Sequence, residues 1–155
     1  MTRNKKIILF VAVVLIAIQF IQPAHNINGQ VSPGDFGKIY SVPVNVQTSL
    51  QVACYDCHSN NTRYPWYANI QPPGWMMARH IKNGKAKLNF SEFGSYTGRR
   101  QISKLKGIAT QIKDGDMPLS SYTLIHKNAI LSAADKNLII EWVYKTADSL
   151  SAISN

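Results

Sequence analysis

The two cysteines of this chain stand in a single short motif, and this motif constrains the fold more than any other feature. The stretch CYDCHSNNTRYPWY covers residues 54–67, with Cys54 and Cys57 three apart and His58 directly after the second thiol. On one helical turn, two thiols at this spacing lie on the same side. C-x-x-C-H is the attachment pattern of haem c, in which both thiols bond the porphyrin and the histidine binds iron. The pattern therefore predicts one covalent haem as a large apolar part of the core.

Two cysteines can also serve in a zinc site, a redox pair or a disulfide, but the surrounding sequence does not favour any of these three uses. A structural zinc site needs four ligands, commonly from two such pairs, and the chain has no second pair. A thioredoxin-like redox pair belongs in a βαβ unit, whereas the flanking residues here have helical periodicity. A disulfide between Cys54 and Cys57 would close a very small loop and stabilise little.

The N-terminus has the pattern of an export signal. The stretch MTRNKKIILFVAVVLIAIQFIQP places basic residues before an apolar run from Ile7 to Ile21. About 15 apolar residues span roughly 22 Å as a helix, short of the ~30 Å hydrocarbon core, so a cleaved signal and an uncleaved anchor are both compatible with it. We favour an anchor at 1–22, with the exported domain facing the periplasm from a bacterial inner membrane.

The rest of the chain predicts an all-α protein with a small helical domain. Residues 23–43, rich in Gly and Pro, indicate a linker, and residues 44–155 the haem-binding domain. Apolar spacings of three and four predict helices from Val46 to about residue 57, from Pro72 or Pro73 to Gly84, over 97–113, and from a capping box at Ser132 and Asp135 to Leu150. Long loops at 60–72, 84–96 and 115–130 separate them.

The sequence offers five candidates for a distal iron ligand: Met117, His80, His126, Met76 and Met77. Pro118 excludes Met117 from the α region, and Gly115 allows a sharp turn just before it, so this methionine is expected in an extended loop that can return to the ring. His80 is the main alternative, because two histidines can also ligate haem iron. His126 is expected to be a structural hydrogen-bonder, and Met76 and Met77 are expected in the core.

Three stretches together resemble a known family. They are CYDCHSNNTRYPWY, PPGWMMARHIKNGKAKLNFSEF and MPLSSYTLIHKNAILSAADKNLIIEWV, and the resemblance covers about Val46 to Ala147. The chain is similar to the haem-binding-domain family of small, exported, membrane-anchored c-type cytochromes of bacterial envelopes. This resemblance implies an all-α, cytochrome c-like helical fold wrapped around a single haem on Cys54, Cys57 and His58. The Met-Pro segment of the family falls on Met117 and Pro118. Phe93 stands where this family would have tryptophan, which affects only loop packing.

A haem with both axial positions filled predicts electron transfer rather than catalysis; the alternative is a haem enzyme or sensor with an open or displaceable distal site. The formal charge of +9, from 17 Lys and Arg against 8 Asp and Glu, favours acidic redox partners such as a membrane oxidase or reductase, and we expect no nucleic-acid partner. Candidate contacts with the haem edge or propionates are Arg63, Tyr64, Trp66, Arg79, Arg99 and Arg100.

Overall fold

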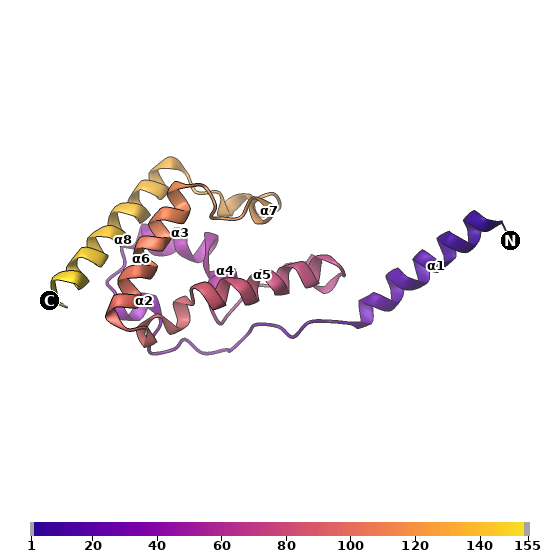
Figure 1. Cartoon of the computed structure of the whole chain (residues 1–155), viewed down its shortest axis with the longest axis horizontal. Helices are drawn as coiled ribbons and strands as arrows, with labels where there is room; N and C mark the ends of the chain where they lie inside the picture. The colour runs from indigo at the N-terminus through magenta and orange to yellow at the C-terminus, as the bar shows by residue number, and fades with distance from the viewer. Residues whose placement is uncertain (1, 154–155) are drawn as a thin grey trace.

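The computed structural model describes residues 2–153 and is helical throughout (Figure 1). Its elements in chain order are α1 Arg3–Ala17, η1 Ile18–Phe20, α2 Phe36–Ile39, α3 Val44–Ala53, α4 Tyr55–His58, η2 Trp66–Asn69, α5 Pro73–Lys87, η3 Phe90–Ser95, α6 Gly98–Lys113, α7 Ser120–Thr123, η4 Lys127–Ala129 and α8 Ala133–Ile153. No strand occurs within 2–153 beyond one isolated antiparallel bridge between Ile27 and Asn61. The all-α prediction is confirmed.

Helix α1 projects away from the compact domain (Figure 1). Its side chains are exposed along the whole helix. Of the helices within 2–153, none combines the length and the apolar character needed to cross a membrane.

The core lies between α6 and α8, which pack side by side with α3 across them (Figure 1). The apolar stripe predicted for residues 97–113 is confirmed, because Leu105, Ile108, Ala109 and Ile112 are all buried. Helix α8 contributes Ile139, Val143 and Ala147. Leu138 is 40% exposed, since it lies one position off the buried stripe.

The predicted start of α8 is also confirmed. The Ser132 hydroxyl accepts a hydrogen bond from the Asp135 backbone N–H at 3.1 Å, and the Asp135 carboxylate accepts from the Ser132 N–H at 3.3 Å and from its hydroxyl at 2.6 Å. This reciprocal capping box satisfies amide groups that the first helical turn leaves without partners. At the other end of the core, Gly115 follows α6 with φ +80°, the left-handed conformation that its sequence position predicted.

The segment expected to be a linker, 23–43, supplies part of the core. Asp35 caps α2 by accepting a hydrogen bond from the Gly37 N–H at 3.0 Å, and the next residue, Phe36, is fully buried. The Phe36 ring lies edge-on to those of Phe90, Phe93, Tyr40 and Trp142. A Gly- and Pro-rich stretch concealed this role, because one aromatic anchor has no periodicity.

Two expected helix boundaries were wrong. The first helix begins at Val44 and ends at Ala53, because Cys54 takes φ −126° and ψ −40°, and the separate turn α4 then carries Cys57 and His58. Helix α5 continues past Gly84 to Lys87. Gly84 is therefore not a terminating residue but a point of close contact inside the helix.

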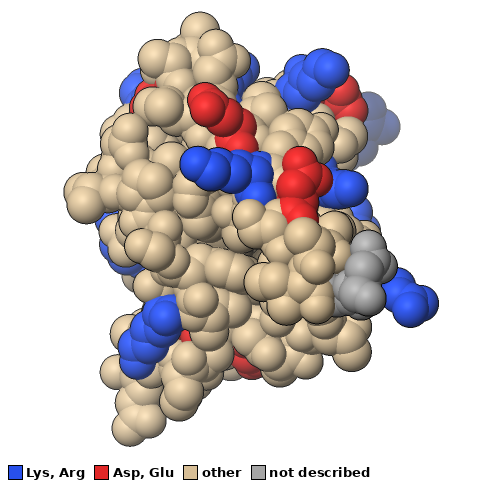
Figure 2. Space-filling model, turned by 90° about the vertical axis from the view of Figure 1, so that its left-hand side faces the viewer, with Lys and Arg blue, Asp and Glu red and all other residues tan. Residues whose placement is uncertain are grey.

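Charged side chains are mixed in sign on the face at the α8 end of the domain (Figure 2). Lys and Arg lie there next to Asp and Glu. The basic excess of the chain therefore does not gather on that face.

Candidate haem-binding site

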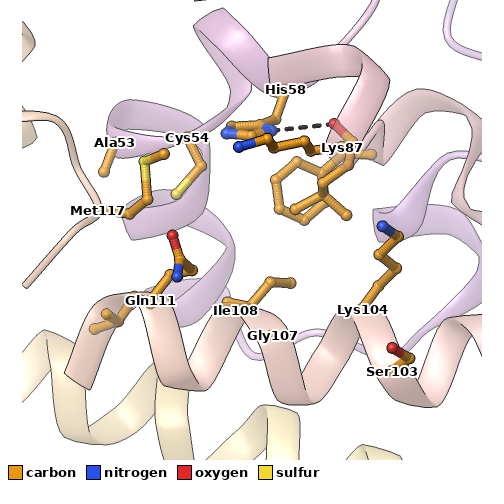
Figure 3. A pocket seen from close by; sticks show the side chains of 13 residues that line it. Ala53, Cys54, His58, Lys87, Ser103, Lys104, Gly107, Ile108, Gln111 and Met117 are labelled. Atoms are coloured by element: carbon orange, nitrogen blue, oxygen red, sulfur yellow. Dashed lines mark hydrogen bonds between the residues drawn. The ribbon is translucent and has the colours of Figure 1, made fainter. Parts of the chain in front are cut away.

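A cavity of about 440 Å³ lies between α6 and the α4 turn (Figure 3). Its lining consists of Ala53, Cys54, His58, Lys87, Leu88, Phe90, Ser103, Lys104, Gly107, Ile108, Gln111, Ile112 and Met117. The volume falls within the range of cofactor pockets, and most of the lining is apolar. His58 and Met117, which are 59 positions apart in the sequence, thus line the same cavity.

The His58 ring is held in one tautomer by the backbone. Its Nδ1 lies 3.1 Å from the Leu88 carbonyl oxygen, just past the end of α5. A carbonyl can only accept, so Nδ1 carries the proton and the neutral ring keeps its lone pair on Nε2. Burial lowers the pKa of His58, which favours this neutral form. A backbone acceptor on the far nitrogen is the usual arrangement for a histidine that ligates a metal.

Helices α4 and α5 cross closely enough to fix the position of this histidine. A Cβ placed on Gly84 would lie 2.6 Å from the Cys57 carbonyl oxygen, closer than any real side chain comes. Only glycine therefore permits the crossing. The same stretch of α5 leads directly to Leu88, so one contact sets both the backbone before His58 and the acceptor of its Nδ1 proton.

The two thiols do not face one common space, contrary to the expectation from their spacing. Cys54 lines the cavity, whereas Cys57 packs against a small second cluster formed by Ala68, Met77 and Ile81. The break in the helix at Cys54 accounts for the difference, because i and i+3 side chains align only along a continuous helix. Burial raises the pKa of Cys54 to about 12 and that of Cys57 to about 11, which favours the protonated thiols over the thiolates.

Of the five distal candidates, Met117 is the one that lines the cavity. It is half-buried in the loop after α6, where its N–H donates to the Gln111 carbonyl at 3.1 Å. His80 is half-buried on α5 and lies outside the lining. His126 is the structural hydrogen-bonder that was expected: its Nε2 lies 2.6 Å from the Tyr67 hydroxyl, and its ring stacks on Tyr122.

The two other methionines divide between core and surface. Met77 is buried, as predicted. Met76 is 57% exposed, so the core assignment of this residue was wrong. The reason is rotation about α5, which turns adjacent residues to different sides.

The residues proposed for the haem edge lie elsewhere. Arg63 pairs with the buried Asp56 carboxylate at 3.3 Å, and Tyr64 stacks on His25 at 4.1 Å between ring centroids. Trp66 is 77% exposed, and Arg79 is exposed on α5. Neither Arg99 nor Arg100 lines the cavity, and the Arg100 guanidinium lies 4.5 Å above the Tyr96 ring.

Two lysines that sequence patterns did not single out take this place. Lys87 from α5 and Lys104 from α6 extend along the cavity (Figure 3), where their ammonium groups could pair with carboxylates. Gly107, which follows Lys104 along α6, leaves this wall of the cavity open, because a Cβ there would meet nothing within 4 Å. A glycine inside an otherwise regular helical stripe was the available signal for this wall of the cavity.

The donor set fits a haem. The cavity offers an imidazole with a free Nε2, a thioether, one thiol and an apolar body, with two cations at its edge. No group of three or more His, Cys, Asp or Glu side chains able to hold a metal ion occurs among residues 2–153.

Comparison with known proteins gives one match. A family model described as a haem-binding domain matches residues 13–145, most of the chain. No curated protein and no solved structure matches the chain.

Proposed function

Because the chain belongs to the haem-binding domain family, we propose that it is a mono-haem c-type cytochrome that carries electrons at a bacterial inner membrane. Family membership supports haem as the cofactor. The covalent attachment, the single haem and the carrier role are our proposal. When bound, the haem supplies a centre for one-electron oxidation and reduction.

The observation that carries the proposal is the orientation of His58. Its Nδ1 donates to Leu88, and Nε2 is left with a lone pair beside a cavity of about 440 Å³ that Cys54 and Met117 also line. In the proposed holoprotein Cys54 and Cys57 would hold the porphyrin, with the Cys57 side chain turned from the Ala68, Met77 and Ile81 cluster toward the cavity, and His58 and Met117 would bind the iron.

The remaining lining residues have separate tasks. The apolar side chains of Leu88, Phe90 and Ile108 exclude water from the ring. Lys87 and Lys104 would neutralise the two propionate charges, a role that the sequence had suggested for arginines. With both axial positions occupied, no open site remains for a substrate, which favours electron transfer over an enzymatic role.

We further propose that the segment 1–22 attaches the protein to the membrane and that the domain faces the periplasm. The basic residues before Ile7 and the apolar, exposed side chains of α1 support membrane association. A membrane oxidase or reductase is then the expected partner. Export also fits the cysteines, because covalent attachment protects them in an oxidising compartment.

The test is extraction of the haem from denatured protein. Full-length protein is expressed with a c-type maturation system, denatured in acid and organic solvent, and analysed by mass and by absorption. We expect the porphyrin to remain with the chain and the mass to exceed that of the polypeptide by one haem. A freely extracted porphyrin rules out covalent attachment, and a protein that takes up no haem at all rules out the proposal. Cys57→Ala should retain one thioether at most and give much less holoprotein.

A further inference from the structure

The domain has an exposed apolar surface at the end where the N-terminal helix joins it. Five side chains make up this surface, which we call the apolar end: Phe20, Ile21, Trp66, Ile70 and Met76. Their exposed fractions range from 44% for Ile70 to 84% for Phe20. Large apolar side chains that gather in one exposed patch mark a binding surface.

The segment after α1 is fixed to this end by hydrogen bonds. The Gln19 side chain accepts from the Gln71 N–H at 2.9 Å and donates to the Gln71 carbonyl at 3.2 Å. Gln22 donates to the Asn69 carbonyl at 3.1 Å and accepts from the Gln71 amide at 2.9 Å. The Trp75 indole donates to the Ile21 carbonyl at 2.8 Å. The chain leaving α1 is therefore attached to η2 and the start of α5, and the domain is not suspended on a free tether.

A second exposed pair extends the surface. Leu124 and Ile125, 69% and 59% exposed, follow α7. The hydrogen bond between Tyr67 and His126 ties this loop to η2. In Figure 1, α7 and the start of α5 lie on the side of the domain that faces α1.

The charge distribution matches a lipid surface. Residues 1–34 and 57–91 contain no Asp or Glu, while the second stretch contains Arg63, Arg79 and three lysines. At the α8 end, by contrast, Asp and Glu lie among Lys and Arg (Figure 2), and Asp56, which accepts a hydrogen bond from Tyr122 of α7, is buried and paired with Arg63. Trp at an apolar patch with nearby basic side chains is the composition that favours the headgroup and acyl boundary of an anionic bilayer.

We propose that the apolar end docks on the interfacial region of a phospholipid bilayer, beside the N-terminal helix, so that the domain is held in one orientation. The proposal rests on the membrane attachment proposed above, and adds a second contact made by the domain itself. The occupant is lipid rather than a protein groove partner, because the patch is continuous with the apolar residues that end the N-terminal segment.

The test is photolabelling of full-length holoprotein in vesicles that contain a lipid with a diazirine near the glycerol backbone. Vesicles are made of phosphatidylcholine, with or without phosphatidylglycerol. Trypsin separates the relevant regions, because cleavage after lysine and arginine gives peptide 7–38 with most of α1, peptide 64–79 with three residues of the apolar end, and peptide 137–145 from α8. The last peptide carries Leu138 and Tyr144, each 40% exposed, and serves as the control surface.

We expect peptide 64–79 to be labelled several-fold more than peptide 137–145, with stronger labelling when phosphatidylglycerol is present and weaker labelling at high salt. The variant with Trp66→Ser, Ile70→Ser and Met76→Ser should lose this label, and Met76→Asp alone should reduce it. The matched control, Leu138→Ser with Tyr144→Ser, should leave it unchanged. All these side chains are exposed, and the haem absorption of each variant checks that the domain is folded.

Equal labelling of peptides 64–79 and 137–145, with peptide 7–38 strongly labelled, overturns the proposal while the membrane anchor stands. An unlabelled peptide 64–79 in a protein that forms dimers in detergent assigns the patch to a second copy and also overturns it. Absence of label from peptide 7–38 refutes the proposed anchor, and absence of covalent haem refutes the proposed cytochrome; the absorption spectrum of the same sample separates these outcomes.

Discussion

Gly84→Ala tests whether the crossing of α4 and α5 positions the haem ligand. The added Cβ would lie 2.6 Å from the Cys57 carbonyl oxygen and 3.3 Å from its carbonyl carbon. Both are backbone atoms, so no flexible side chain can move aside. The two helices must separate by about 0.4 Å to reach even the shortest contact that real Cβ atoms show. Such overpacking costs about 1–3 kcal/mol of unfolding free energy.

Helix propensity acts in the opposite direction. Replacing glycine by alanine in a helix interior stabilises by about 1 kcal/mol. The net change should therefore be a loss of up to about 2 kcal/mol, and overpacking should win because the clash involves the backbone. Asn83→Ala is the matched control: Asn83 is the exposed neighbour of Gly84 in α5, and alanine there should stabilise by about 0.5 kcal/mol without a clash.

The assay is urea unfolding of both holoproteins, followed by helical circular dichroism and by the haem absorption band. Retreat of α5 also carries the Leu88 carbonyl away from His58 Nδ1, now 3.1 Å distant, so the haem band of Gly84→Ala should shift even under native conditions. Equal stabilisation of Gly84→Ala and Asn83→Ala, with unchanged absorption, would refute a tight contact between the two helices.

Three further predictions concern the distal ligand, the segment 23–43 and the capping box of α8. Met117→Ala should abolish the weak far-red absorption band of an iron–thioether bond, lower the reduction potential and allow carbon monoxide to bind the iron, while the covalent haem is retained. His80→Ala should change none of these properties. The reverse result makes His80 the distal ligand. Phe36→Ala should lower the free energy of unfolding of the holoprotein by about 3–5 kcal/mol, measured by urea unfolding, because Phe36 is fully buried. A negligible change would show that residues 23–43 act only as a linker. Hydrogen bonds from Ser132 lower the pKa of Asp135, so the capping box stabilises above the unfolded-state pKa and this stability is lost as pH falls through the folded-state value. Ser132→Ala should therefore destabilise the protein at neutral pH and destabilise it less in acid, as measured by urea unfolding at both pH values; a difference independent of pH contradicts the reasoning.

Local patterns predicted most of the helical framework. The stripe of α6 and the capping box of α8 are set by residues three and four apart, so they can be recognised without knowledge of distant contacts. The same is true of Gly115, whose turn is a local backbone property. Errors arose where a distant contact decided the outcome. Helix α5 passes Gly84 because that residue faces Cys57, and Phe36 is buried because four aromatic rings, those of Tyr40, Phe90, Phe93 and Trp142, surround it.

The candidate site divides in the same way. The C-x-x-C-H motif alone predicted the haem, the proximal histidine and the covalent bonds, since that chemistry depends on residue types at fixed spacing. The sequence also made Met117 the first choice for the distal ligand, from the Pro118 and Gly115 that flank it. Only the tertiary structure shows that Met117 lines the same cavity as His58. His80 lies outside that cavity.

Only the tertiary structure identified Lys87 and Lys104 as the cations at the cavity, in place of four arginines. Surface charges carry no periodicity that marks their direction, so their role depends on how α5 and α6 pack. The His58 tautomer was equally beyond the sequence, because it is set by the Leu88 carbonyl 30 residues away. The sequence by itself determined which chemistry this chain can support. Which groups surround that chemistry was decided by packing, since a contact between distant segments is a property of the whole fold.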